Sequence, residues 1–220
     1  MEENIKKKLV RNWFLTIQEL ICHEIEKIEN GSSHFKTKVW FRSETKDEGG
    51  GKSKLLKNGN VFEKVGVNFS EVYGNFSNEF KKKIPRFNNS KDFWASGISI
   101  VMHMKNPYIP AMHFNTRYII TDHGWFGGGM DFTPCFKDSA LEKIVEKKLK
   151  AMCNKHGKNY YKKYKKWCDD YFYLHNRNEP RGIGGIFFDY KKENWDRDFA
   201  FVRDVGICLL YTSPSPRDAH

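Results

Sequence analysis

Apolar residues recur at intervals of three and four along the first part of the chain, which is the spacing of one face of an α-helix. The residues on this face are Leu9, Val10, Trp13, Phe14, Ile17, Leu20, Ile21, Ile25 and Ile28. Asn30 and Gly31 come next, and both residue types are typical of a helix end. The pattern therefore predicts a long opening helix that ends at this pair and packs its apolar face into the core.

Alternating side chains predict a strand after this helix. The alternation covers Phe35, Lys36, Thr37, Lys38, Val39, Trp40 and Phe41. Asn58-Gly59 separates two apolar runs, residues 54–56 and 61–69, and predicts a hairpin. Gly49–Lys52 is glycine-rich but lacks the Gly-Lys-Ser/Thr sequence of a P-loop, so we predict a mobile loop or a loop at the edge of a substrate site.

Two further strands are predicted at residues 93–104 and 112–119, where the period of two collects polar side chains on one face. These side chains are Ser99, His103, His113, Asn115 and Arg117. Burying so many donors without a ligand would leave many of them unsatisfied. We therefore interpret this face as a binding site, although a single histidine taken alone is more often a satisfied strand residue.

The register expected for these two strands is antiparallel, with His103 opposite His113. Ser99 then lies opposite Arg117, because opposed residues point to the same side of a sheet. This pairing would gather the polar candidates into one patch.

Two later segments have helical spacing. Asp138 or Ser139, together with Glu142, resembles a capping box that starts the first segment, which ends near Gly157. The second segment carries an aromatic stripe that we interpret as core packed against a sheet: Tyr160, Tyr164, Trp167, Tyr171 and Phe172. Strands gathered before and after long helices predict one α+β domain, an antiparallel β-sheet flanked by helices on both faces.

Composition narrows the class of protein. The net charge of +11 favours anionic partners, but its lysine runs are typical of a solvated surface, and we expect no nucleic-acid partner. The five cysteines form no C-x-x-C pair, which argues against a zinc knuckle and a complete disulfide framework. No apolar run is long enough for a membrane span, and the acidic start is unlike a signal peptide. We expect a cytoplasmic protein.

Two glycine-rich surfaces suggest a flat ligand. The segment from Glu179 to Tyr190 places glycines and Arg181 at the mouth of an apolar strand, and residues 125–134 place glycines before Asp131. A guanidinium suits a carboxylate, and a carboxylate can accept hydrogen bonds from ring N–H groups. The alternatives are a tight turn for the glycines and a turn or helix-cap role for Asp131.

At these residues the chain closely resembles oxygen-dependent coproporphyrinogen III oxidase, a family of the haem pathway. The motifs that carry the resemblance are Gly49–Ser53, Val61–Gly74, Ala95–Ser99, Lys105–Pro107, Trp125–Pro134, Lys165–Asp169 and Glu179–Asp189. Together they extend from about residue 11 to residue 206, and motifs of this length and order are far more specific than one glycine pattern.

The resemblance implies an oxidoreductase that acts on CH–CH groups with molecular oxygen as acceptor. It would convert two propionate groups of coproporphyrinogen III into vinyl groups, giving protoporphyrinogen IX, carbon dioxide and hydrogen peroxide. Neither flavin nor haem is implied, so orientation and electrostatics would replace a cofactor. A non-catalytic tetrapyrrole-binding protein is the alternative, and a homodimer is the implied assembly.

Site residues follow from the same motifs. The resemblance implies that His113 is the acid/base residue and that Asp131 accepts from the pyrrole N–H groups. A histidine suits the first role because its ordinary pKa is near neutrality. The implied substrate-binding residues are Ser99, Asn115, Thr116, Arg117, Arg181 and Gly182.

Metal binding is a point of departure from the family. Some members are described with a divalent metal held by four histidines, and His103 and His113 match the first two positions. The others fall near Glu146 and one residue beyond His175, so we expect no required metal and keep these four residues as weak candidate ligands.

The end of the chain is the second departure. The family pattern holds through Gly206 and then stops. We therefore expect one domain over residues 1–206, incomplete at its C-terminal end, and a non-native tail over residues 207–220.

Overall fold

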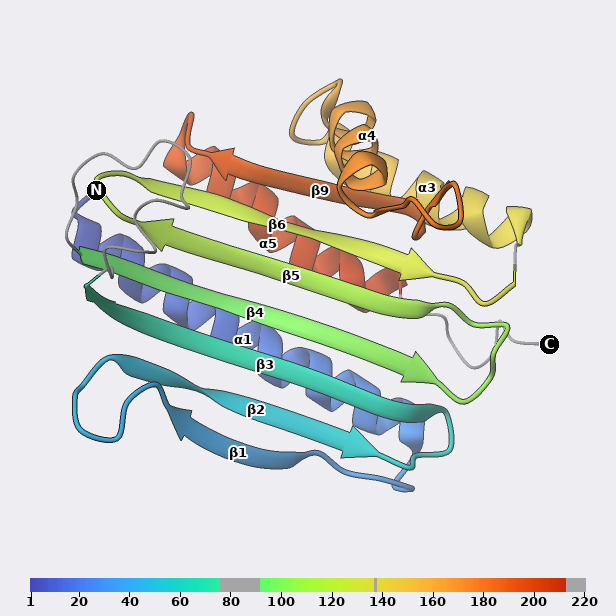
Figure 1. Cartoon of the computed structure of the whole chain (residues 1–220), viewed down its shortest axis with the longest axis horizontal. Coiled ribbons are helices and arrows are strands. Elements are labelled where there is room, and N and C mark those ends of the chain that lie inside the picture. The colour runs from blue at the N-terminus through green and yellow to red at the C-terminus, as the bar shows by residue number, and fades with distance from the viewer. Residues whose placement is uncertain (76–91, 137, 213–220) are drawn as a thin grey trace.

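A sheet of seven antiparallel strands organises the residues that the computed structural model describes, 1–75, 92–136 and 138–212. Its strand order is β1-β2-β3-β4-β5-β6-β9 (Figure 1). These strands are β1 (Lys36–Phe41), β2 (Gly49–Lys57), β3 (Phe62–Asn75), β4 (Asp92–Met104), β5 (Ala111–Ile120), β6 (Gly124–Thr133) and β9 (Ile183–Lys191). A second, two-stranded sheet pairs β7 (Tyr173–Leu174) with β8 (Glu179–Pro180).

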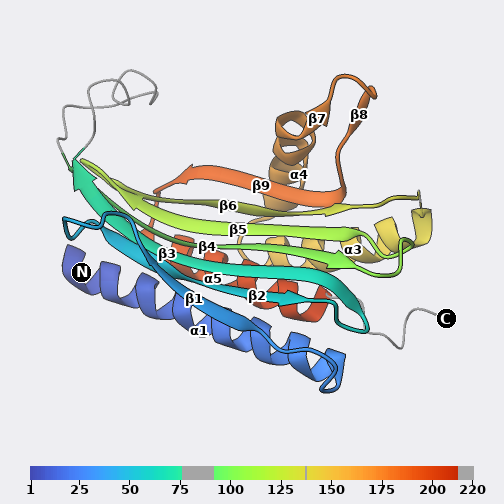
Figure 2. The same cartoon turned by 60° about the horizontal axis from the view of Figure 1, so that its bottom comes forward.

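The helices of the described residues are α1 (Glu3–Glu29), α3 (Ser139–Asn154), α4 (Tyr160–Tyr171) and α5 (Trp195–Thr212). Figure 2 shows α1 and α5 along one face of the sheet, while α4 packs on β9 and rises past it on the opposite side. This arrangement confirms the predicted α+β fold. The cover is uneven, because β4 and β5 keep part of their second face exposed.

The core lies between the sheet and the α1/α5 layer. Ile98 and Ile100 of β4 are each 1% exposed, and Phe14 and Ile17 of α1 are fully buried. Each such side chain contributes about 1.5–3 kcal/mol by leaving water. The opening helix is confirmed, including its end, because Asn30 adopts the left-handed conformation at φ 49° and its backbone N–H bonds to the last turn.

The later helices also match prediction. Asp138 caps α3 by accepting hydrogen bonds from the backbone N–H groups of Ala140 at 2.8 Å and Leu141 at 3.0 Å. The second predicted helix is α4. None of the described helices combines the length and the apolar character that a membrane crossing needs.

The predicted domain limit falls inside a helix, since α5 continues past residue 206 to Thr212. Residues 213–220 of the predicted tail lie outside the described residues. The boundary and the non-native tail therefore stay predictions.

The prediction of a glycine-rich loop at Gly49–Lys52 is wrong, because these residues form the first part of β2. They pair with β1 and β3 in a regular ladder. A Cβ on Gly51 would lie 2.7 Å from the Trp40 ring, so the glycine leaves room for the indole of the neighbouring strand. The missing side chain at Gly51 therefore allows close packing between strands. Composition alone cannot distinguish a glycine-rich strand of this kind from a glycine-rich loop.

The hairpin predicted at Asn58-Gly59 is confirmed. Asn58 has φ 58°, and its backbone N–H bonds to the carbonyl of Glu63 at 2.9 Å. Glu29, which is 1% exposed, holds the turn from the end of α1 by accepting the backbone N–H of Phe62 at 2.7 Å and of Val61 at 3.1 Å. One buried carboxylate thus ties the helix to the start of β3.

We expect Glu29→Gln to destabilise the protein by about 1–3 kcal/mol at pH 7, because it weakens these charge-assisted hydrogen bonds. Burial alone would raise the pKa of Glu29, but hydrogen bonds from Ser32 and from the backbone of Phe62, Asn60 and Val61 outweigh it and lower the pKa. The carboxylate therefore contributes stability above its unfolded pKa, and this contribution is lost as pH falls through the lower folded value.

Urea unfolding between pH 7 and pH 3 measures this effect. The wild-type chain should lose more stability on acidification than the variant. Equal acid sensitivity of the two proteins would contradict the role given to Glu29.

Candidate functional site

The polar face predicted for β4 and β5 is present, but the predicted register is wrong. His113 lies opposite Val101 rather than His103, and Arg117 lies opposite Gly97 rather than Ser99. The shift is two residues, so every side chain keeps its predicted face. The turn is responsible.

That turn is held by Asn106. Its side-chain Oδ1 accepts the backbone N–H of Tyr108 at 3.0 Å, and its carbonyl accepts that of Ile109 at 3.1 Å. The connection is therefore centred one residue earlier than the predicted register requires, and a one-residue change in the centre of a hairpin shifts the pairing by two.

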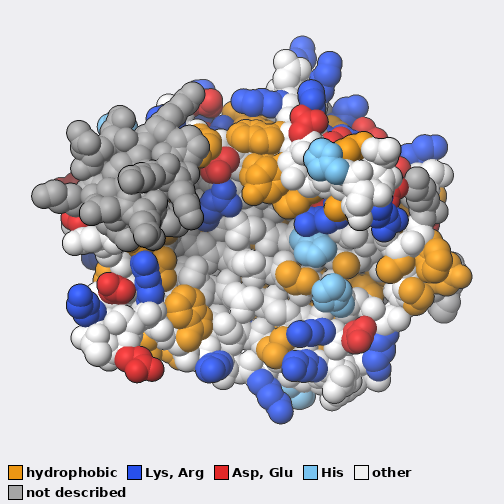
Figure 3. Space-filling view, viewed as in Figure 1, with side chains coloured by type: hydrophobic (Ala, Val, Ile, Leu, Met, Phe, Trp, Pro, Cys, Tyr) orange, Lys and Arg blue, Asp and Glu red, His pale blue; other side chains and the backbone are white. Residues whose placement is uncertain are grey.

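Strand β6 extends the polar face. Asp131 lies opposite His113, Gly129 opposite Asn115, and Gly127 opposite Arg117. A pocket of about 300 Å³ opens over these strands. Its lining is Ser99, Ile100, Val101, His113, Phe114, Asn115, Arg117, Gly128, Gly129, Met130, Asp131, Tyr171, Phe172, Arg181 and Phe187. Figure 3 shows this face as a hollowed area of backbone and small polar groups, bordered by histidine, cationic and hydrophobic side chains.

Arg117 is held from two sides. Its Nη1 donates to Asn115 Oδ1 at 3.1 Å, and its Nη2 donates to Asp189 Oδ2 at 2.7 Å. Asn115 is in turn oriented through its Nδ2, which donates to the Ile98 carbonyl at 3.2 Å. These two contacts define the plane of the guanidinium, and the Arg117 side chain, 30% exposed, remains partly accessible to an anion.

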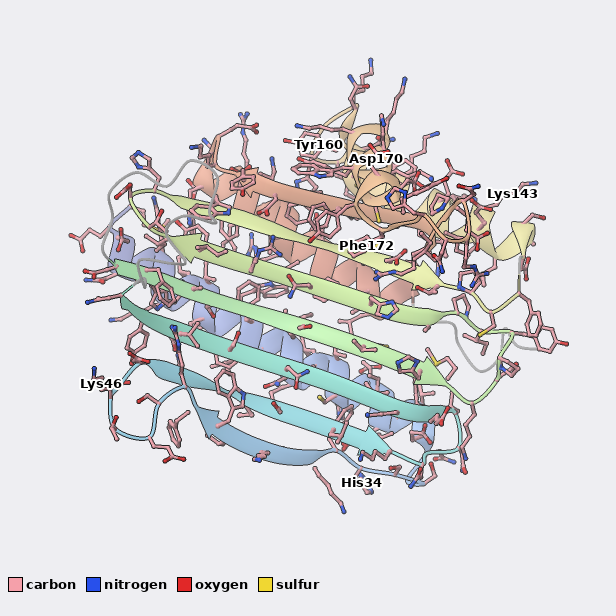
Figure 4. All side chains as sticks on the ribbon, in the orientation of Figure 1. His34, Lys46, Lys143, Tyr160, Asp170 and Phe172 are labelled. Atoms are coloured by element: carbon pink, nitrogen blue, oxygen red, sulfur yellow. The ribbon has the colours of Figure 1, made fainter. Side chains whose placement is uncertain are left out.

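Arg181 is held in a comparable way on the other side of the pocket. Its Nε donates to Asp131 Oδ2 at 2.7 Å, and its guanidinium lies 3.9 Å from the centre of the Phe172 ring. Figure 4 labels Phe172, which follows α4 and lies near β9 and β6. The Asp131 side chain is 4% exposed, so its predicted contact with pyrrole N–H groups needs a donor that can reach a nearly buried oxygen.

His113 lies opposite Asp131, the partner of Arg181. Burial lowers its pKa below the ordinary histidine value, Arg181 and His103 lower it further, and Asp131 acts in the opposite direction. Its Nδ1 is 3.4 Å from the hydroxyl of Thr133. The lowered pKa favours a neutral imidazole at neutral pH, which can accept a proton from a bound ligand.

The remaining predicted residues divide between the two faces of the sheet. Ser99 lines the pocket. Gly182 adjoins Asp131, since a Cβ there would lie 1.6 Å from Asp131 Oδ1. Thr116 is 1% exposed and shares the face of Phe114. Its side chain therefore faces the helix layer rather than the pocket, and its role in substrate binding stays a prediction.

The weak metal candidates do not form a ligand set. The rings of His103 and His113 are 6.4 Å apart between centres. The described residues contain no group of three or more His, Cys, Asp or Glu side chains arranged to hold a metal ion. His175 instead contacts the ring of Tyr173, with 5.2 Å between centres. These donors do not fit the family's metal site, and the expectation of no required metal stays a prediction.

Sequence reasoning missed two groups at this pocket. Asp189 had no assigned role, and it binds Arg117 directly. Tyr171, interpreted as core, is 62% exposed and stacks on Phe187 with 4.3 Å between ring centres. Strand alternation places Phe187 on the pocket face, but helix periodicity does not indicate that Tyr171 extends beyond the sheet edge.

Comparisons with known proteins place the chain among its relatives. The family model described as Coproporphyrinogen III oxidase matches residues 9–212. The oxygen-dependent coproporphyrinogen-III oxidase of Rickettsia akari is 47% identical over 213 residues, covering 94% of this chain and 76% of that protein. The proteins of the same name from Rickettsia africae and Rickettsia bellii are each 46% identical with the same coverage.

We expect Arg181→Gln to raise the pKa of His113. The substitution removes a neighbouring cation and leaves the Asp131 carboxylate without its partner, and both changes favour the charged imidazole. A pH titration followed by NMR of the imidazole C–H signals measures the shift, with the His113 signal assigned from its absence in His113→Asn.

Arg177→Gln is the matched control, because Arg177 pairs with Glu179 and does not contribute to the His113 pKa. This control should leave the midpoint unchanged. An unchanged or lower midpoint in Arg181→Gln would contradict the electrostatic coupling between the two residues.

Proposed function

The chain belongs to the coproporphyrinogen III oxidase family, and we propose that it catalyses the oxygen-dependent oxidative decarboxylation of coproporphyrinogen III in haem biosynthesis. The observation that carries the proposal is identity of 46–47% across 94% of the chain to proteins of this name. The pocket supports it, because two guanidinium groups border a glycine-lined surface that a flat, anionic tetrapyrrole can approach.

Each of the two conversions has a defined balance. The bond between the carboxylate carbon and its neighbour breaks, carbon dioxide leaves, and the electron pair of that bond forms the vinyl double bond. A hydride equivalent leaves the carbon next to the pyrrole. Together with one proton from solvent it reduces O₂ to hydrogen peroxide. We propose molecular oxygen as the acceptor and no resident organic cofactor.

The proposed roles follow from the charges and geometry of the pocket. Arg117 and Arg181 bind propionate carboxylates, since a guanidinium offers donors in a fork that matches two acceptor oxygens. Neutral His113 acts as the acid/base residue. Ser99 and Asn115 contact the macrocycle from the floor of the pocket. Binding energy at the carboxylates then positions the reacting side chain.

The cellular setting is also a proposal. We propose a cytoplasmic enzyme that acts as a homodimer and takes coproporphyrinogen III and oxygen as its partners. We propose no nucleic-acid partner and no membrane span.

The function is tested by incubating the chain with coproporphyrinogen III in air and under nitrogen. Vinyl product, carbon dioxide and hydrogen peroxide are expected in air and absent under nitrogen. Tight tetrapyrrole binding without carbon dioxide release in air would overturn the proposal in favour of a binding protein.

We expect His113→Ala to lower kcat by about 10²–10⁴, the usual contribution of a general acid or base. His34→Ala is the matched control, because His34 is exposed and lies at the β1 end of the molecule, far from the pocket (Figure 4). The control should retain turnover. A loss of activity in His113→Ala that is fully explained by a lower melting temperature would contradict the catalytic role.

A further inference from the structure

We propose that Asp189 is a positioning residue that holds Arg117 in the orientation needed for a substrate propionate, and that a local distortion of β9 beside it fixes its carboxylate. The inference rests on the proposed function. It concerns the carboxylate at the end of the Glu179–Asp189 motif, which contacts the arginine at 2.7 Å.

The first observation is a β-bulge at this point. Gly128 pairs with Phe188, whereas Phe126 pairs with Lys191. Two residues of β9, Asp189 and Tyr190, therefore oppose the single residue between them on β6. A bulge of this kind changes the direction of a side chain relative to the regular ladder. Regular alternation with Phe187 already places Asp189 opposite Gly127 on the pocket face, so the extra residue is Tyr190.

The second observation is the backbone of Tyr190. Its φ is 52°, a left-handed conformation that a bulky residue rarely adopts. The conformation brings its backbone N–H to Asp189 Oδ1 at 3.0 Å. Its ring stacks on Trp125 at 5.7 Å between centres. The carboxylate is therefore anchored through Oδ1 while Oδ2 binds the arginine, and local backbone strain supports this position.

The third observation is Gly127, the residue that faces the bulge. A Cβ at this position would lie 2.3 Å from Asp189 Oδ1 and 3.1 Å from Arg117 Nη2. The ion pair thus occupies the space that any side chain would take. Bulge, left-handed backbone and missing side chain all favour one position of the Asp189 carboxylate.

The consequence for catalysis is orientation rather than affinity. With Asn115 on Nη1 and Asp189 on Nη2, the guanidinium plane of Arg117 is fixed before substrate arrives. Removing Asp189 also removes a negative charge that competes with the propionate. The two effects oppose each other in binding, but only the loss of orientation acts on the chemical step.

Two substitutions test this inference by different physical routes. Asp189→Asn keeps the shape and removes the charge, while Gly127→Ala keeps both charges and displaces them. For each, we expect kcat to fall by about 10–100-fold and KM to change by less than about threefold. The double variant should be no slower than about the slower single variant, because both changes act on one contact.

The matched controls are Gly66→Ala and Asp170→Asn. Gly66 lies opposite Val101 on the same face of the sheet, and a Cβ there would approach only Asn68 Nδ2, at 3.7 Å. Asp170, labelled in Figure 4, forms an exposed ion pair with Lys166 on α4. Both controls should retain the kcat and KM of the wild-type chain.

The assay is turnover of coproporphyrinogen III in air, with melting temperature measured on every variant. A kcat in Asp189→Asn and Gly127→Ala equal to that of the controls overturns the inference alone. A kcat loss explained by lower melting temperature also overturns it, since that result indicates a structural role. Absence of turnover in the wild-type chain overturns the proposed function and, with it, the inference that rests on it.

Discussion

The period of two along an antiparallel sheet covered by α1 and α5 on one side is the constraint on which the site depends. In β4 the apolar residues Ile98 and Ile100 face the helices, so Ser99 and Val101 must face the other way. A slip by one residue would expose the core of the strand and bury its polar residues. Packing of the helix layer therefore determines which side chains reach the pocket.

Within that face, charge is placed in pairs. Arg117 is paired with Asp189, and Arg181 with Asp131. The formal charge of these four residues sums to zero, although the whole chain carries +11. A general excess of cations therefore does not explain how this pocket would bind an anion. In the proposed function, the guanidinium groups select a carboxylate because they are oriented in advance and keep part of their surface exposed.

The sequence predicts which face a residue takes better than which residue it lies beside. Burial of apolar residues decides the face, and this was correct for His113 and Arg117. The register depends on the turn at Asn106, whose side-chain hydrogen bond no periodicity reveals. Thr116 illustrates the same distinction. Alternation places it on the other face of the sheet from Asn115 and Arg117, whereas the family motif suggested a substrate contact.

Other features lie beyond local sequence because they depend on the neighbouring strand. Gly51 resembles a loop residue until the Trp40 ring is seen to fill its space. Asp189 resembles an ordinary strand residue until its carboxylate is seen to fill the space beside Gly127. In both cases the glycine makes room for a side chain on the neighbouring strand. A glycine-rich motif is therefore ambiguous in the sequence alone, because a loop, a ligand-binding surface and a packing site can all have this composition.

The charge pairs also connect substrate binding to the protonation of His113. Arg181 lowers the pKa of this histidine, and Asp131 raises it. A carboxylate bound to Arg181 adds a negative charge near the imidazole and so favours its protonated form. By linkage, a protonated imidazole must then favour the bound carboxylate to the same extent. In the proposed mechanism, the free pocket keeps the histidine neutral and able to accept a proton, and the anionic substrate itself makes that acceptance easier.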